Sequence, residues 1–67
     1  MGTPTNQGDL IRRARERANM PTTALAVATG RCDASIRNYE AGRTRPPRSV
    51  LLRIAAATGA TLEELDQ

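Results

Sequence analysis

The sequence of 67 residues lacks histidine, lysine, phenylalanine and tryptophan, and it has a single cysteine and a single tyrosine. One cysteine excludes a disulfide within the chain, and a chain with one cysteine and no histidine lacks the ligands that zinc prefers. No run of about 18 apolar residues exists, so no segment is predicted to span a bilayer. The polar start, MGTPTNQ, does not resemble a secretory signal. We therefore expect a cytoplasmic protein without a metal or another cofactor.

Catalytic chemistry has little support in the sequence. Without histidine there is no obvious general base beside a nucleophile, and no glycine-rich loop precedes a helix in the manner of a phosphate cradle. We expect that the protein is not an enzyme and that it binds no small-molecule ligand.

Positive charge is concentrated in the middle of the chain. The formal net charge is +3, all ten basic residues are arginines, and residues 31–53 contain six of them against two acids. Residues 54–67 contain three acids and no basic residue. A basic segment in a small domain favours a nucleic-acid partner, because arginine forms paired hydrogen bonds with phosphate or guanine. Ordinary surface charge explains the balance equally well, so charge alone leaves both interpretations open.

The apolar pattern predicts an all-α fold of five short helices in one compact bundle. A chain of this length forms one domain, and such a domain buries only about 60% of its unfolded surface. Residues 1–7 are expected to be disordered, and residues 8–67 to form the domain. The expected helices are Asp9–Ala18, Thr22–Thr29, Asp33–Glu40, Arg48–Thr58 and a short one opened by Thr61. Thr22 is the natural cap of the second helix, and Thr61 with Glu64 fits a capping box.

Two of these helices form the strongest motif. A helix, a short turn containing Gly30 and a second helix make up a helix-turn-helix unit. Helical spacing turns Ile36 and Tyr39 to one side of the helix at 33–40. The opposite side carries groups that can read base edges, namely Asp33, Ala34, Arg37 and Asn38. Eight residues make a rod of about 12 Å, which fits the width of the major groove.

Residues 10–65 resemble the phage repressor and Cro helix-turn-helix family, which includes the xenobiotic-response-element type regulators. The resemblance rests on RRARERANM, LAVATG, SIRNYEAGRTRPP and LLRIAAATGATLEEL. It implies a lambda-repressor-like fold in which the helix at 33–40 enters the major groove of double-stranded DNA. Pro21 departs from the usual Ser or Asn cap, and Thr29, Arg31 and Thr58 replace apolar residues, so we expect a weak core.

The resemblance also implies roles for individual residues. The positions that match base-facing or groove-facing residues are Cys32, Asp33, Ala34, Arg37 and Asn38. The positions that match phosphate-binding residues are Thr22, Arg43, Arg45 and Arg48, and Arg31 can reach a phosphate while its stem covers the core. Arg15 and Glu40 match an ion pair that joins the first helix to the third.

Two side chains at the start of the third helix have competing roles. Local rules make Asp33 the best helix cap, whereas the family register puts Cys32 at that position. A capping Asp33 is not free to read a base. We expect Cys32 to be a small buried residue and not a redox sensor.

The leading hypothesis is a sequence-specific transcriptional regulator, in particular a repressor that binds a palindromic operator as a homodimer. The alternative is a protein-interaction module or an antitoxin-like adaptor with the same fold. In that case the same fold would bind a partner protein.

Overall fold

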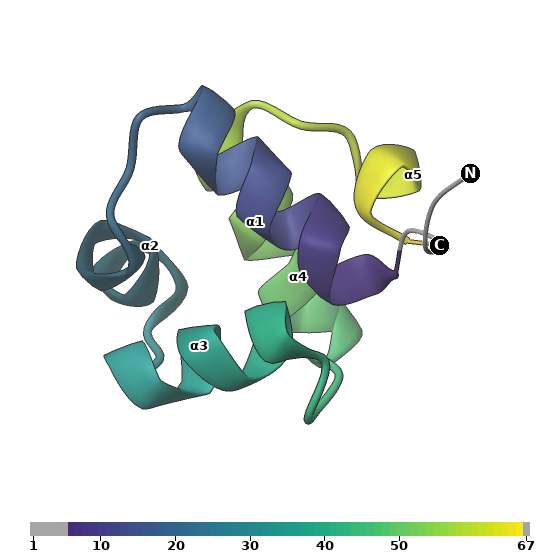
Figure 1. Cartoon of the computed structure of the whole chain (residues 1–67). Coiled ribbons are helices and arrows are strands. Elements are labelled where there is room, and N and C mark those ends of the chain that lie inside the picture. The colour runs from purple at the N-terminus through teal and green to yellow at the C-terminus, as the bar shows by residue number, and fades with distance from the viewer. Residues whose placement is uncertain (1–5, 67) are drawn as a thin grey trace.

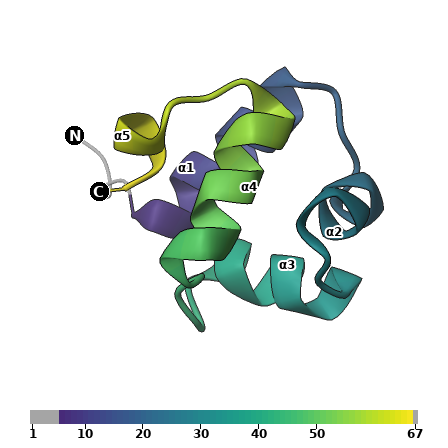
Figure 2. The same ribbon diagram turned by 180° about the vertical axis from the view of Figure 1, so that it is seen from behind.

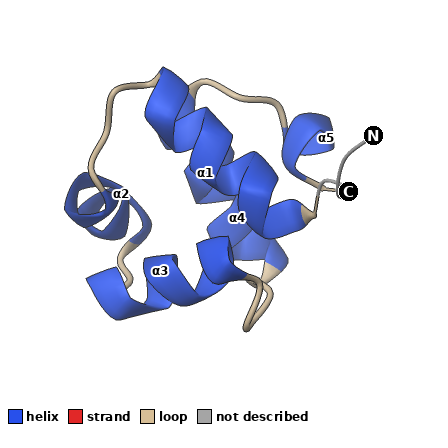
Figure 3. Ribbon diagram, viewed as in Figure 1, coloured by secondary structure: helices blue, strands red, loops and turns tan. Residues whose placement is uncertain are grey.

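The computed structural model describes residues 6–66, and these residues form helices and loops without a strand (Figures 1 and 3). The helices are α1 (Gln7–Arg17), α2 (Thr22–Thr29), α3 (Asp33–Ala41), α4 (Arg48–Thr58) and α5 (Leu62–Leu65). The α1 and α4 helices form the centre of the molecule, α2 and α5 lie at its opposite ends, and α3 lies along one edge (Figures 1 and 2). The expected all-α fold of five helices is confirmed.

Glycine determines where three of the helices end. The caps of α2, α3 and α4 are Gly30, Gly42 and Gly59, with φ values of 73°, 78° and 80°. These values lie in the left-handed region, where a side chain is strained and glycine is not. The sequence therefore predicted the ends of α2 and α4 correctly, and that of α3 to within one residue.

The start of α1 differs from the expectation. Residues 1–7 were expected to be disordered, but the Asn6 side chain accepts a hydrogen bond from the Asp9 N–H and caps the helix. Gln7 is buried, and its Nε2 donates to the Leu65 carbonyl oxygen at 3.2 Å. The start of α1, two residues before Asp9, thus combines a local effect, the Asn6 cap, with a long-range one, the contact of Gln7 with Leu65. Residues 1–5 lie outside the described part of the chain.

The core consists of small and branched side chains. Ile11, Leu25, Ile36 and Ile54 have no exposed surface, and Leu65 is 1% exposed. Each comes from a different helix, so every helix contributes one fully buried anchor. Thr29 is buried among these apolar side chains, and its hydroxyl donates to carbonyls of its own helix. The core has the threonine expected from the sequence, which keeps its apolar volume small.

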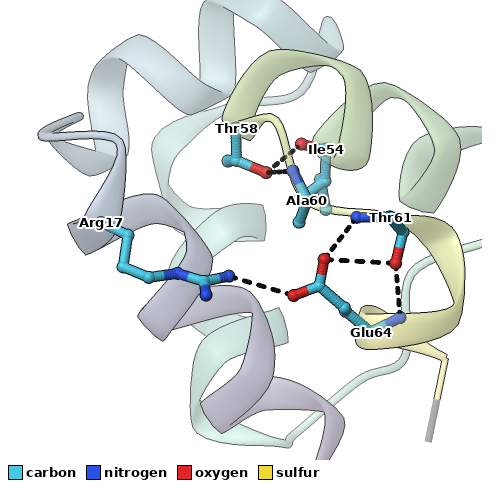
Figure 4. Close-up of polar contacts among 6 residues, drawn as sticks. All are labelled: Arg17, Ile54, Thr58, Ala60, Thr61 and Glu64. Carbon is cyan, nitrogen blue, oxygen red and sulfur yellow. Dashed lines mark hydrogen bonds and ion pairs between the residues drawn. The ribbon is translucent and has the colours of Figure 1, made fainter.

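The α5 helix is held by polar contacts at its start (Figure 4). The Thr61 hydroxyl accepts from the Glu64 N–H, and the Glu64 carboxylate accepts from the Thr61 N–H, so the predicted capping box is present. The loop before it is fixed by Thr58, whose hydroxyl donates to the Ile54 carbonyl of α4 and accepts from the Ala60 N–H of the loop at 3.4 Å. Arg17 of α1 reaches the Glu64 carboxylate at 3.4 Å. These contacts attach a four-residue helix that would not be stable alone.

Candidate nucleic-acid interface

The α3 helix is attached to the molecule by one face only. Ile36 is fully buried and Tyr39 is 8% exposed, and both point toward the core between α1, α2 and α4. The remaining face of α3 turns outward along the edge of the molecule (Figure 1). It carries exposed Ala34 and Arg37, half-buried Asn38 and exposed Ala41. The structure therefore presents a helix face of about 14 Å that no other helix covers.

A paired arginine fixes the position of α3 relative to α1. Arg15 Nε lies 2.6 Å from Glu40 Oε2, and Arg15 Nη2 lies 3.2 Å from Glu40 Oε1. A third donor, Nη1, bonds the Met20 carbonyl oxygen at 2.8 Å. The hydrogen bond to Glu40 raises the pKa of the Arg15 guanidinium, against the opposing effect of its burial. The ion pair implied by the resemblance is present, and it joins the first helix, the following turn and the third helix.

A close approach of α1 to α3 reinforces this arrangement. A Cβ atom at position 8 would lie 2.5 Å from the Glu40 carbonyl oxygen and 2.6 Å from that of Tyr39. Only glycine fits there. The last turn of α3 therefore rests directly on the first turn of α1, which fixes the angle at which α3 crosses the molecule.

The start of α3 differs from the expectations in two respects. Cys32 occupies the N-cap position, as the family register implies, but it makes no side-chain capping bond. Its thiol is exposed, so the expectation of a small buried residue is wrong. The Ser35 hydroxyl, 3.3 Å from Sγ, is the main cause that lowers the pKa of the thiol. Asp33 is the first helical residue and not the cap, which resolves the two alternatives for its capping role.

The carboxylate of Asp33 is instead engaged with the next turn of its own helix. Asp33 Oδ2 lies 2.8 Å from Arg37 Nε, a pair at the i, i+4 spacing. The other oxygen, Oδ1, is buried and has no hydrogen-bond partner among residues 6–66. Arg37 remains 70% exposed in this pair. Its guanidinium can therefore still contact DNA, although part of its charge is balanced by Asp33.

The loop after α3 brings an arginine back to the exposed face. Arg43 Nη1 donates to Asn38 Oδ1 at 3.3 Å, across the left-handed turn at Gly42. Sequence reasoning missed this contact. The available signal was Gly42, which lies between Asn38 and Arg43. A glycine that ends a helix lets the chain turn back, so the residue after it lies next to the last turn of that helix.

The remaining predicted phosphate-binding residues lie at both ends of α3. Arg31 is exposed in the turn before α3, and Arg45 is exposed in the loop after it. Neither forms an ion pair with another residue in the range 6–66. Arg48 begins α4 and lies 3.7 Å from Asp66 in an exposed pair. Thr22 is the first residue of α2 and not its cap, because Pro21 takes that position without a capping side chain.

Two other features are absent from the described residues, a metal cluster and a membrane-spanning helix. Within residues 6–66, no three of the acidic and cysteine side chains gather in a manner suited to a metal ion. No helix in that range is long and apolar enough to cross a membrane.

A helix pair joined by a short glycine turn, with the second helix exposed along one edge, defines a helix-turn-helix protein. The chain belongs to the helix-turn-helix domain family, whose model matches residues 8–67. The fold is that of the phage repressors, which confirms the resemblance of the sequence. No curated protein matched in a search by sequence.

Two solved structures are similar over nearly the whole chain. One is a crystal structure of the P22 c2 repressor protein in complex with a synthetic operator, with a TM-score of 0.86 and 24% identity. That match covers 92% of this chain and 94% of the repressor chain. The other is the solution structure of the DNA-binding domain of the same repressor, with a TM-score of 0.86 and 26% identity. It covers 97% of this chain and 84% of that domain.

Proposed function

We propose that the protein is a sequence-specific DNA-binding transcriptional regulator, in particular a repressor, with α3 placed in the major groove. The observation that carries this proposal is the uncovered face of α3, flanked at both ends by arginines without acidic partners. A rod of this length enters the groove, and arginines beside it meet the two phosphate strands that border the groove. The P22 c2 repressor, which has the same fold, has been observed on operator DNA.

Base edges would be read from α3 and phosphates from its flanks. The proposed base-reading or groove-facing residues are Asn38, Arg37, Ala34, Asp33 and Cys32. The proposed phosphate-binding residues are Thr22, Arg31, Arg43, Arg45 and Arg48. Phosphate contacts supply affinity for any sequence, and base contacts supply the preference for one. Asp33 has the weakest support as a reader, because its carboxylate is bonded to Arg37.

A homodimer follows from the size of the reading surface. One helix of this length contacts only a few base pairs, which is too little for a unique site. Two copies related by a twofold axis would read a palindrome with half-sites about 34 Å apart. This part of the proposal rests on geometry and on the resemblance to phage repressors.

The test is selection from a pool of random duplexes, followed by a salt titration on the selected duplex and on a scrambled one. We expect a palindrome, bound at least about a thousandfold more tightly than the scrambled duplex. Asn38→Ala should relax the preference at one base pair of each half-site, while Arg45→Ala should weaken binding to every duplex evenly. Equal, weak and salt-sensitive binding to all duplexes would contradict the proposal and favour an acidic protein partner.

A further inference from the structure

We propose that Arg43 positions Asn38, so that an arginine on the phosphate side of the interface determines which bases Asn38 accepts. The inference rests on the proposed function and assigns one of its phosphate-binding residues a part in sequence preference.

The geometry that carries the inference is the contact between the two side chains. Arg43 Nη1 lies 3.3 Å from Asn38 Oδ1. Asn38 is half-buried on the outward face of α3, and Arg43 is exposed in the loop directly after the Gly42 turn. The backbone holds the pair together as well, because the Arg43 N–H donates to the Asn38 carbonyl oxygen at 3.0 Å. The two residues are thus linked by main chain and by side chain.

This contact fixes which end of the amide faces the groove. A guanidinium only donates hydrogen bonds, so the amide atom that faces it must be the oxygen. Asn38 Nδ2 then points away from Arg43 and offers its two N–H donors to a base. Guanine, adenine and thymine each present an acceptor in the major groove, whereas the groove edge of cytosine presents only the N4 donor. Asn38 held in this orientation donates to the first three and disfavours cytosine, whose N4 donor would have to share the amide oxygen with Arg43.

Arg43 can keep this contact while it binds a phosphate. The guanidinium has five N–H donors, and the side-chain contact with Asn38 uses one of them. The same residue would then neutralise a phosphate and hold the amide. Without Arg43, the Asn38 amide can rotate by half a turn and offer its oxygen to the cytosine N4 group.

Arg45 supplies a matched control two residues away. It is exposed, carries the same charge in the same loop, and has no hydrogen bond or ion pair to α3 in the described structure. Substitution of a residue that contacts only phosphate weakens binding to all DNA sequences alike. The Arg43→Gln and Arg45→Gln proteins should therefore lose a similar amount of affinity for DNA in general. Only Arg43→Gln should also change the preference among DNA sequences.

The experiment measures binding of the whole chain to the selected duplex and to its three variants at the base pair that Asn38→Ala relaxes. Wild-type protein, Arg43→Gln, Arg45→Gln, Asn38→Ala and the double variant Asn38→Ala/Arg43→Gln are compared at one salt concentration. We expect the wild type to reject cytosine at that position by about tenfold, and Arg43→Gln to reduce this to about twofold. Arg45→Gln should keep the tenfold preference, and the double variant should match Asn38→Ala in its preference.

Two results would overturn the inference, and a third, distinguishable from them, would refute the proposed function on which it rests. Equal weakening of all four duplexes by Arg43→Gln, as by Arg45→Gln, would make Arg43 a simple phosphate contact. A selective wild type in which Asn38→Ala relaxes no position would remove Asn38 as a reader. A wild type that selects no sequence would instead refute the proposed function itself. Because Arg43 is exposed, its variant should keep the wild-type melting temperature, which circular dichroism checks.

Discussion

Arg15 is the most constrained charged residue of the described chain. Its guanidinium bonds both oxygens of Glu40 and the Met20 carbonyl, and the side chains of the pair are only 14% and 10% exposed. A buried ion pair contributes little relative to apolar packing, but the loss of one partner leaves a buried charge without compensation. The pair therefore specifies the docking of α3 more than it adds net stability.

Glu40→Gln should lower the free energy of unfolding by about 3 kcal/mol, because the Arg15 charge stays buried without its counter-ion. Urea denaturation followed by circular dichroism measures the change. Arg12→Gln is the control, since Arg12 pairs with Asp9 at 3.5 Å with 51% of its side chain exposed. We expect this control to change stability by less than about 0.5 kcal/mol. Equal effects of the two substitutions would show that the buried pair has no special structural role.

Thr29→Val should raise the free energy of unfolding by about 0.5–1 kcal/mol. The Thr29 hydroxyl is buried and donates only to the carbonyls of Leu25 and Ala26, in its own helix. These carbonyls already accept hydrogen bonds within the helix, so they keep a partner when the hydroxyl is removed. Replacing the hydroxyl by a methyl group of similar shape therefore removes a buried polar group with little loss of hydrogen bonding.

Thr58→Val provides the contrast in the same urea experiment. The Thr58 hydroxyl also accepts from the Ala60 N–H at 3.4 Å, which links the end of α4 to the following loop. We expect its loss to lower stability. A decrease for Thr29→Val as well would mean that the hydroxyl at position 29 contributes to the core.

At the scale of the helices, the sequence predicted the number and order of the elements, because several of the boundaries have a local signal. Gly30 and Gly59 stop α2 and α4, and Thr61 with Glu64 opens α5. The start of α1 has a local signal in the Asn6 cap, but it also includes the hydrogen bond of Gln7 with the Leu65 carbonyl oxygen near the other end of the chain. No local rule contains a contact of that separation.

The candidate site was predictable to a smaller degree. Helical periodicity identified the outward face of α3, because Ile36 and Tyr39 define the buried one. The exposure of Cys32 and the contact of Arg43 with Asn38 depend on how the chain turns at each end of α3. These turns are three-dimensional features that a helical projection does not include.

The close approach of α1 and α3 predicts an asymmetry between two glycines. Gly8→Ala should lower stability by about 3 kcal/mol, because its Cβ would overlap the backbone oxygens of Tyr39 and Glu40. Gly42→Ala should lower stability by only about 1 kcal/mol. A Cβ at this position meets no other atom, so the only cost is the backbone strain at a φ of 78°. Thermal unfolding of both variants measures the difference. A milder effect at position 8 than at position 42 would contradict the rigid contact between the helices.

The attachment of α5 should depend on pH through Glu64. Hydrogen bonds from the Thr61 backbone and hydroxyl, and then from Arg17, lower the pKa of the Glu64 carboxyl. Its folded pKa lies below the unfolded value of about 4.3, so the stabilising effect is present above that value. The effect is lost as the pH falls through the lowered folded pKa.

Glu64→Gln should therefore make stability less dependent on pH in the acid range. Urea midpoints measured between neutral and acidic pH compare the variant with the wild type. Parallel acid profiles for the wild type and Glu64→Gln would exclude a contribution of the capping box.

At the scale of the whole molecule, much of the acidic charge lies away from the ends of α3. Arg31, Arg43 and Arg45 lie at the two ends of α3, whereas Glu63, Glu64 and Asp66 belong to the region of α5, where Arg17 and Arg48 pair with two of them. A molecule with this distribution approaches DNA in a preferred orientation, since its acidic end is repelled by the phosphates.

The affinity for DNA should fall as the salt concentration rises, and the steepness of this fall should reflect the number of phosphate contacts. Four arginines, Arg31, Arg43, Arg45 and Arg48, predict a log–log slope of about −3 to −4 for each bound protomer. Each Arg→Gln substitution in this set should reduce the slope by about 1. Arg13→Gln is the control, because Arg13 lies on α1 beside Leu65 of α5. A slope near zero would show that the flanking arginines do not meet phosphates.

The hydrogen bond from Gln7 to the Leu65 carbonyl joins residues 58 positions apart. During synthesis the first helix leaves the ribosome long before its partner does, so this contact can form only when nearly all of the domain has emerged. Until then the first turn of α1 has its Asn6 cap but lacks its contact with α5. The two ends of the domain are therefore joined in a late step of folding, after the C-terminal residues have emerged.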